Sequence, residues 1–192
     1  MGILSTEQLQ AIGFQSIGRD VRISDKASIY GAARISIGDN VRIDDFCVIS
    51  AGEGGVRIGS HIHIAIYSSL VGAASITLGN FCNISSRVSI YSSSDDYSGQ
   101  YMTSPVVGEP FTRVNNSPVR LDRHVIVGSG SVILPGAHLE QGVAIGALSL
   151  VSSYCEEFGI YAGVPARRIK ERARDLVELE AAFLCKYRDE NR

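Results

Sequence analysis

The chain has no tryptophan, two methionines, five prolines and no apolar run long enough to cross a bilayer. A membrane-spanning helix needs about 20 predominantly apolar residues, so we expect no span. The N-terminal stretch, MGILSTEQLQ, lacks the basic and apolar regions of a signal peptide, and we therefore expect a cytoplasmic protein. A formal net charge of -2 over 192 residues gives no indication of binding to nucleic acid or an anionic membrane.

Glycine is abundant instead, and an aliphatic residue recurs every six residues along most of the chain. The rows are Ile17, Ile23, Ile29; Ile37, Ile43, Ile49; Ile58, Ile64, Leu70; Leu78, Ile84, Ile90; and Leu121, Val127, Ile133, Leu139, Ile145, Val151. Such a hexapeptide period is the signature of a parallel β-helix, in which three units form one triangular coil. Because side chains alternate along a strand, the aliphatic position and the residue two before it point inward.

The rhythm divides the chain into three parts. The β-helix is expected over residues 15–172, with an extended loop at 91–118 that interrupts the repeats. Residues 1–14 form a short helical cap, with a capping box between Ser5 and Gln8. Residues 173–192 form a terminal helix, because apolar residues recur there at helical spacing. The fold class is therefore all-β, although periodicity alone does not give the hand of the helix.

The four cysteines are expected to be free thiols, as is usual in a reducing compartment. Cys47 and Cys82 fall on the inward row, two before an aliphatic residue, so we expect them in the core. Cys155 and Cys185 fall outside the repeats. The flat sides of stacked coils are commonly covered by closed oligomers, which predicts a homo-oligomer with sites between subunits.

The hexapeptide rows, the loop after the fourth triplet and the ending "YAGVPARRIKER" together resemble the left-handed β-helix acyltransferases. Within that family, "RVSIYSSSDDYSG" and "GALSLV" are most similar to enzymes of O-antigen sugar assembly, of the dTDP-4-amino-4,6-dideoxyglucose (viosamine) acetyltransferase type. The resemblance implies a left-handed β-helix, a homotrimer, and acetyl transfer from acetyl-CoA to a nucleotide-linked amino sugar. It implies no metal.

His63 is the candidate general base. It stands between two inward isoleucines, Ile62 and Ile64, so it points out of the β-helix. Imidazole titrates near neutral pH, which suits removal of a proton from an attacking amine or hydroxyl. An interface histidine bonded across the trimer is the alternative. Asn83 holds the equivalent outward position one coil later and is a candidate substrate-binding residue.

The loop supplies further candidates. Asp95 or Asp96 could orient His63, attract a protonated amino sugar, or only cap a turn. Tyr97 and Tyr101 could stack on a base or sugar ring, or pack the loop down. Galactoside and maltose O-acetyltransferases of the same family carry a catalytic histidine where this chain has Asp95, a departure that weighs against that activity.

The resemblance also implies a cofactor site beside the last coils. Ser129 and Ala147 match residues whose backbone lines the pantetheine groove, and Ser152 and Ser153 match a threonine–lysine pair, with serine in place of the lysine. The candidates for binding the phosphates are Arg167 and Lys170.

Two other functions remain open. One is O-acetylation of a sugar or glycan by the same chemistry. The other is a γ-carbonic-anhydrase-like metal site, for which three histidines must converge across a subunit boundary; His61, His63 and His124 are the candidates. His138 is expected to be an outward surface or interface residue.

Overall fold

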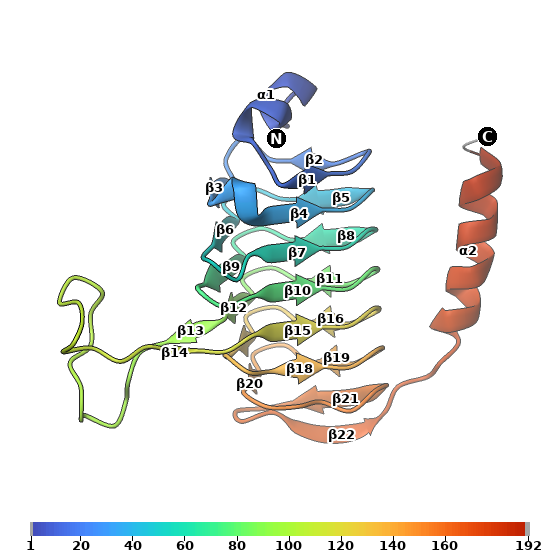
Figure 1. Ribbon diagram of the computed structural model, residues 1–192. Coiled ribbons are helices and arrows are strands. Elements are labelled where there is room, and N and C mark those ends of the chain that lie inside the picture. The colour runs from blue at the N-terminus through green and yellow to red at the C-terminus, as the bar shows by residue number, and fades with distance from the viewer. Residues whose placement is uncertain (1, 191–192) are drawn as a thin grey trace.

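The protein is a left-handed parallel β-helix with one projecting arm and two α-helices, as the computed structural model shows (Figure 1). The structure describes residues 2–190, and side chains as far as residue 186. The last two residues of the predicted terminal segment, 191–192, lie outside the described residues. No helix within residues 2–190 is long and apolar enough to cross a membrane.

Three parallel sheets form the sides of the prism, with one strand of each sheet in each complete coil. The first sheet contains β1 (Ser16–Ile17), β4 (Ile35–Ile37), β7 (Val56–Ile58), β10 (Ile76–Leu78), β15 (Val119–Leu121) and β18 (His138–Leu139). The second contains β2 (Arg22–Ile23), β5 (Val41–Ile43), β8 (Ile62–Ile64), β11 (Asn83–Ile84), β16 (Ile126–Val127), β19 (Ala144–Ile145), β21 (Gly159–Ala162) and β22 (Arg167–Glu171). The third contains β3 (Ser28–Tyr30), β6 (Val48–Ala51), β9 (Ser69–Gly72), β12 (Ser89–Tyr91), β17 (Val132–Ile133) and β20 (Leu150–Val151).

The core consists of the predicted inward rows. Ile64, Ile84 and Val127 stack in register on neighbouring coils, and none of them is exposed to solvent. Cys47 and Cys82 are buried in the same core, as predicted. A narrow prism filled by one or two aliphatic side chains per strand leaves little room for repacking.

Replacing Ile84 with alanine is therefore expected to lower the free energy of unfolding by about 3 kcal/mol, the usual cost of a large-to-small change in a rigid core. Urea denaturation at one fixed protein concentration measures the change. The matched control is Thr77→Ala, an outward position on β10. A loss below about 1 kcal/mol for Ile84→Ala would mean that the coils can collapse into the cavity.

The corners between the first and second sheets have left-handed backbone. His61 (φ 59°) and His124 (φ 63°) lie there. The coils also approach closely at the end of the first sheet. A Cβ atom on Gly38 would lie 2.8 Å from the carbonyl carbon of Gly59 on the next coil, so no larger residue fits there.

The last coil departs from the six-residue period, and the prediction that Cys155 lies outside the repeats is wrong. The backbone of Cys155 forms a parallel β-bridge with Leu139 on the preceding coil, and its side chain is buried. The spacing from Leu139 is 16 residues instead of 18, so stepping by six misses it. All four cysteines are free thiols. The antiparallel pair of β21 and β22 closes this end of the prism.

The loop at 91–118 is an arm that leaves the prism after β12 (Figure 1). Its base is a short antiparallel pair, β13 (Ser93–Ser94) with β14 (Asn115–Asn116). Large side chains beyond the base are exposed, including Tyr97, Val106 and Phe111. The arm extends from the side of the prism opposite α2 (Figure 1).

Helices stand at both ends of the chain. α1 (Thr6–Ile12) begins with the predicted capping box between Ser5 and Gln8, and a one-turn 3₁₀ helix, η1 (Ala32–Arg34), precedes β4. α2 (Leu176–Glu190) runs beside the corner between the first and second sheets (Figure 1). Its Glu180 is buried, paired with Arg123 and His124, which fastens the helix to the prism.

Candidate active site

One outward row runs the whole length of the second sheet. Its members occupy successive strands in register: Arg22, Arg42, His63, Asn83, Ile126, Ala144, Ile160 and Lys170. The row has cationic side chains at both ends, a histidine and an amide in its first half, and apolar side chains in its second half. The same outward row thus contains three residues that were predicted for separate reasons: His63, Asn83 and Lys170.

His63 points outward as predicted, and 42% of its side chain is exposed. Its Nε2 atom lies 2.8 Å from Oδ2 of Asp44, on the coil before. The Nε atom of Arg42 donates to the other carboxylate oxygen of Asp44 at 2.7 Å. The carboxylate that holds His63 within the chain is therefore Asp44, a residue that the repeat pattern does not indicate.

The ionised carboxylate of Asp44 fixes the tautomer of the His63 imidazole. Burial acts to raise the pKa of Asp44, but hydrogen bonds from His63 and Arg42 outweigh it, so the pKa lies below the ordinary carboxyl value. An ionised carboxylate only accepts hydrogen bonds, which places the proton of neutral His63 on Nε2 and leaves Nδ1 as an acceptor. The pair stabilises the fold above about pH 4, and this is lost as the pH falls through the lowered pKa.

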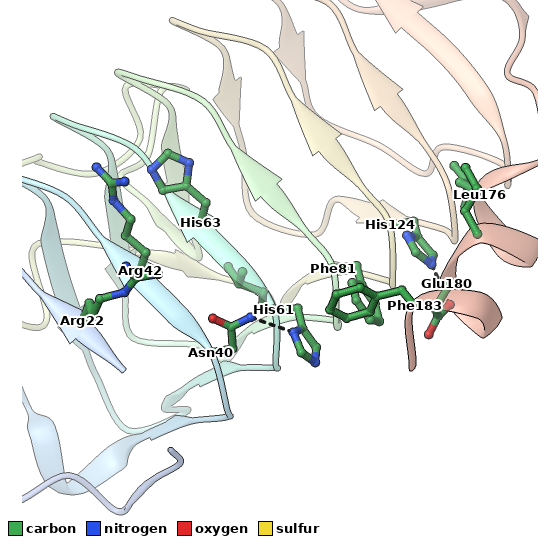
Figure 2. Close-up of a pocket in the computed structure, with 12 residues that line it drawn as sticks. Arg22, Asn40, Arg42, His61, His63, Phe81, His124, Leu176, Glu180 and Phe183 are labelled. Atoms are coloured by element: carbon green, nitrogen blue, oxygen red, sulfur yellow. Dashed lines mark hydrogen bonds and ion pairs between the residues drawn. The ribbon is translucent and has the colours of Figure 1, made fainter. Parts of the chain in front are cut away.

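A groove of about 550 Å³ lies between this row and α2. Arg22, Arg42 and His63 line one end of it, and Figure 2 shows their side chains on the same side. Phe81 and Phe183 line the other end. The volume falls within the range of small-molecule sites, about 300–1,000 Å³.

The aromatic end of the groove is a stack of rings from successive corners. Phe81 lies between His61 and His124, with ring centroids 4.8 and 5.0 Å away. Burial lowers the pKa of His61, which also contacts Asn40 through Nδ1 at 2.9 Å. His63 is held separately by Asp44, so these three histidines do not converge within one chain. Among the described side chains, no group of three or more His, Cys, Asp or Glu residues could hold a metal ion.

The structure does not bring the acids of the arm to His63 within one chain. Asp96 caps a turn, because it accepts hydrogen bonds from the backbone of Ser98 and Gly99, and the Ser98 hydroxyl holds its pKa below the usual value. Asp95 is exposed, and no side-chain hydrogen bond to its carboxylate is found in the described part of the chain. Tyr97 is 92% exposed, whereas Tyr101 lies under Arg113 within the arm.

The predicted cofactor residues fall into three places. Ser129 and Ala147 are exposed on successive coils, at the corner between the second and third sheets. Ser152, Ser153 and Arg167 line one small cavity near the closing hairpin. Lys170 ends the outward row on β22.

No protein-family model matches the chain. It is 54% identical, over 183 residues that cover 95% of both chains, to a dTDP-4-amino-4,6-dideoxy-D-glucose acyltransferase of Escherichia coli. It is 28% identical, over 78% of its length and 74% of the relative, to the putative lipopolysaccharide biosynthesis O-acetyl transferase WbbJ of Escherichia coli strain K12.

A solved structure with a very similar fold is AntD, an N-acyltransferase from Bacillus cereus, in complex with dTDP and 3-hydroxybutyryl-CoA. The TM-score is 0.94 at 45% identity, over 98% of this chain and all of the other. AntD has also been solved as variants in which an aspartate is replaced by asparagine or alanine, and a serine by cysteine, alanine or threonine.

Proposed function

The chain belongs to the dTDP-4-amino-4,6-dideoxyglucose acyltransferase family, and from this we propose that it transfers an acetyl group from acetyl-CoA to the amino group of a dTDP-linked amino sugar. It is an acyltransferase that uses a CoA thioester as cosubstrate. The strongest structural support is the outward row of the second sheet, with a histidine–carboxylate pair facing a groove.

In the reaction, the sugar nitrogen attacks the thioester carbonyl carbon directly. A C–N bond forms, the C–S bond breaks, and CoA leaves as a thiolate that takes up a proton. His63 accepts the proton of the attacking amine on Nδ1, because Asp44 holds the other ring nitrogen. Asp44 also stabilises the imidazolium that forms. We assign the amide of Asn83, the next residue in the row, to binding of the acceptor.

We place the CoA along the second half of the row. From Asn83 to Lys170 there are four strand spacings, or about 19 Å at the usual 4.8 Å. That span suits an extended pantetheine arm, whose apolar stretches would pass Ile126 and Ala144. Lys170 and Arg167, both on β22, are the cations we assign to the phosphates.

In our proposal, a second copy of the chain completes the site. The arm carries exposed aromatic and acidic side chains, among them Tyr97, Phe111 and Asp95, and it projects away from its own prism (Figure 1). A homotrimer would let the arm of one copy cover the groove of the next, with Tyr97 and Tyr101 against the substrate. Of the two acids, we assign Asp95 to attraction of the amino group, because Asp96 already caps a turn.

The pathway and compartment are also proposals. The resemblance to WbbJ supports a role in O-antigen or other surface-polysaccharide assembly. We assign the reaction to the cytoplasm, because all four cysteines are free thiols, as is usual in reducing compartments.

Replacing Asp44 with asparagine is expected to lower kcat about 10- to 100-fold, because Asp44 positions His63 without touching substrate. The amide can donate to the imidazole or accept from it, so the tautomer is no longer fixed. A purely structural role for Asp44 would lower the melting temperature and leave kcat of the folded variant near the wild-type value.

A thioester-release assay with acetyl-CoA tests the function directly. The panel contains dTDP-4-amino-4,6-dideoxyglucose, a 3-amino isomer, a UDP-linked amino sugar and free galactosides. Turnover should be fastest with the dTDP-linked 4-amino sugar. Turnover confined to hydroxyl acceptors would instead support the sugar O-acetyltransferase alternative.

A further inference from the structure

The outward row of the second sheet has a cationic end that the proposed CoA placement leaves unused. Arg22 on β2 and Arg42 on β5 are direct register partners, and Arg42 is in turn the partner of His63. At a strand spacing of about 4.8 Å, Arg22 lies about 10 Å along the row from His63. Both arginines line the same groove as His63 (Figure 2).

We propose that Arg22 and Arg42 bind the diphosphate of the nucleotide-linked acceptor, an inference that rests on the proposed function. The reacting amine must lie beside His63, and the diphosphate is separated from it by one hexose ring. A span of two strand spacings, about 10 Å, accommodates that ring and its phosphates. The two substrates then enter from opposite ends of one row, with their reacting groups meeting at His63 and Asn83.

The guanidinium groups are available for this role. Arg22 is exposed, and no carboxylate among the described residues pairs with it. Arg42 uses Nε for Asp44, and the described residues accept no hydrogen bond from its two Nη atoms. A guanidinium carries five N–H donors in a planar fork, so these two side chains can offer several charge-assisted bonds to phosphate oxygens.

The charges around the groove favour an anion at this end. Asp44, which does not line the groove, is paired with both Arg42 and His63. Among the described residues that line the groove, the one carboxylate is Glu180, which Arg123 and His124 hold at the far end, three coils from Arg42. The groove is therefore cationic at the first coils and neutral to acidic where α2 is fastened.

The test compares Arg22→Gln with Arg57→Gln, a matched control. Arg57 is an exposed arginine on the outward row of the first sheet, at the third coil. Calorimetry with dTDP alone measures binding without turnover. Steady-state kinetics give separate KM values for the dTDP-amino sugar and for acetyl-CoA. Because both side chains are exposed, both variants should keep the wild-type melting temperature.

We expect Arg22→Gln to weaken dTDP binding and to raise the KM of the dTDP-amino sugar, each at least about tenfold. The KM of acetyl-CoA should change less than about twofold. Lys170→Gln should show the opposite selectivity. Equal dTDP binding by the Arg22 and Arg57 variants would overturn the proposal, as would an effect of Arg22→Gln on acetyl-CoA alone.

The two proposals fail in different ways. If the wild type binds dTDP through Arg22 but acetylates no dTDP-amino sugar, the diphosphate site stands and the proposed function falls. If the wild type is active on dTDP-amino sugars and Arg22→Gln behaves like Arg57→Gln, only the diphosphate site falls.

Discussion

Replacing His63 with alanine is expected to lower kcat with the dTDP-amino sugar about 100- to 1,000-fold, the usual loss when a general base is removed. The amine would then have to lose its proton to water. Binding of dTDP should be nearly unchanged, because the proposed contacts of the diphosphate are Arg22 and Arg42. Single-turnover measurement of thioester release separates this loss from slow product release.

The chain offers a matched control for His63. His138 lies on the outward row of the first sheet, with Nε2 3.0 Å from Asp122, and Arg120 donates to the same carboxylate at 2.5 Å. The arrangement repeats that of Arg42, Asp44 and His63, but it lies outside the groove beside α2. His138→Ala should leave kcat within about twofold. A loss below about threefold for His63→Ala would remove it as the base, since less than 1 kcal/mol of the barrier would depend on it.

Deleting the arm is expected to abolish turnover, to below about one thousandth of the wild-type rate, while the prism stays folded. Residues 95–114 would be replaced by Asn-Gly, which closes a two-residue hairpin between Ser94 and Asn115. The loss follows because the arm is proposed to supply Asp95 and to cover the groove of a neighbouring copy. Thermal unfolding and sedimentation show whether fold and assembly survive.

Single variants then separate the contributions within the arm. Asp95→Asn should lower kcat by about 100-fold, and Asp96→Asn by less than about tenfold, because Asp96 serves the turn. An arm-deleted protein that folds, assembles and keeps more than about a tenth of the wild-type rate would contradict the role of the arm.

The sequence predicts the β-helix well, because aliphatic residues recur every six positions along most of the chain. Ile64 and Ile84 are identifiable as inward by counting in sixes, and the same count turns His63 and Asn83 outward. Periodicity succeeds here because alternation along a strand is a local rule that needs no tertiary information.

The partner of His63 could not be found in this way. Asp44 lies on a different coil, 19 positions away, and the contact exists only because insertions at the corners set that coil offset. The same count turns Arg22, the residue before Ile23, outward with His63, but an exposed arginine is common on protein surfaces and by itself predicts no ligand. Cys155 escapes the count because the last coil is two residues short. In the proposed homotrimer the arm acts on another chain, and no periodicity within one sequence predicts that contact.

A crystal structure with CoA and dTDP-4-amino-4,6-dideoxyglucose bound tests the central claim most directly. The account predicts the CoA sulfur and the sugar nitrogen beside His63, with its Nδ1 within about 3 Å of that nitrogen or one water away. The diphosphate should lie toward Arg22 and the pantetheine toward Lys170. A ternary complex in which both reacting atoms lie on another side of the prism, out of reach of His63, would contradict it.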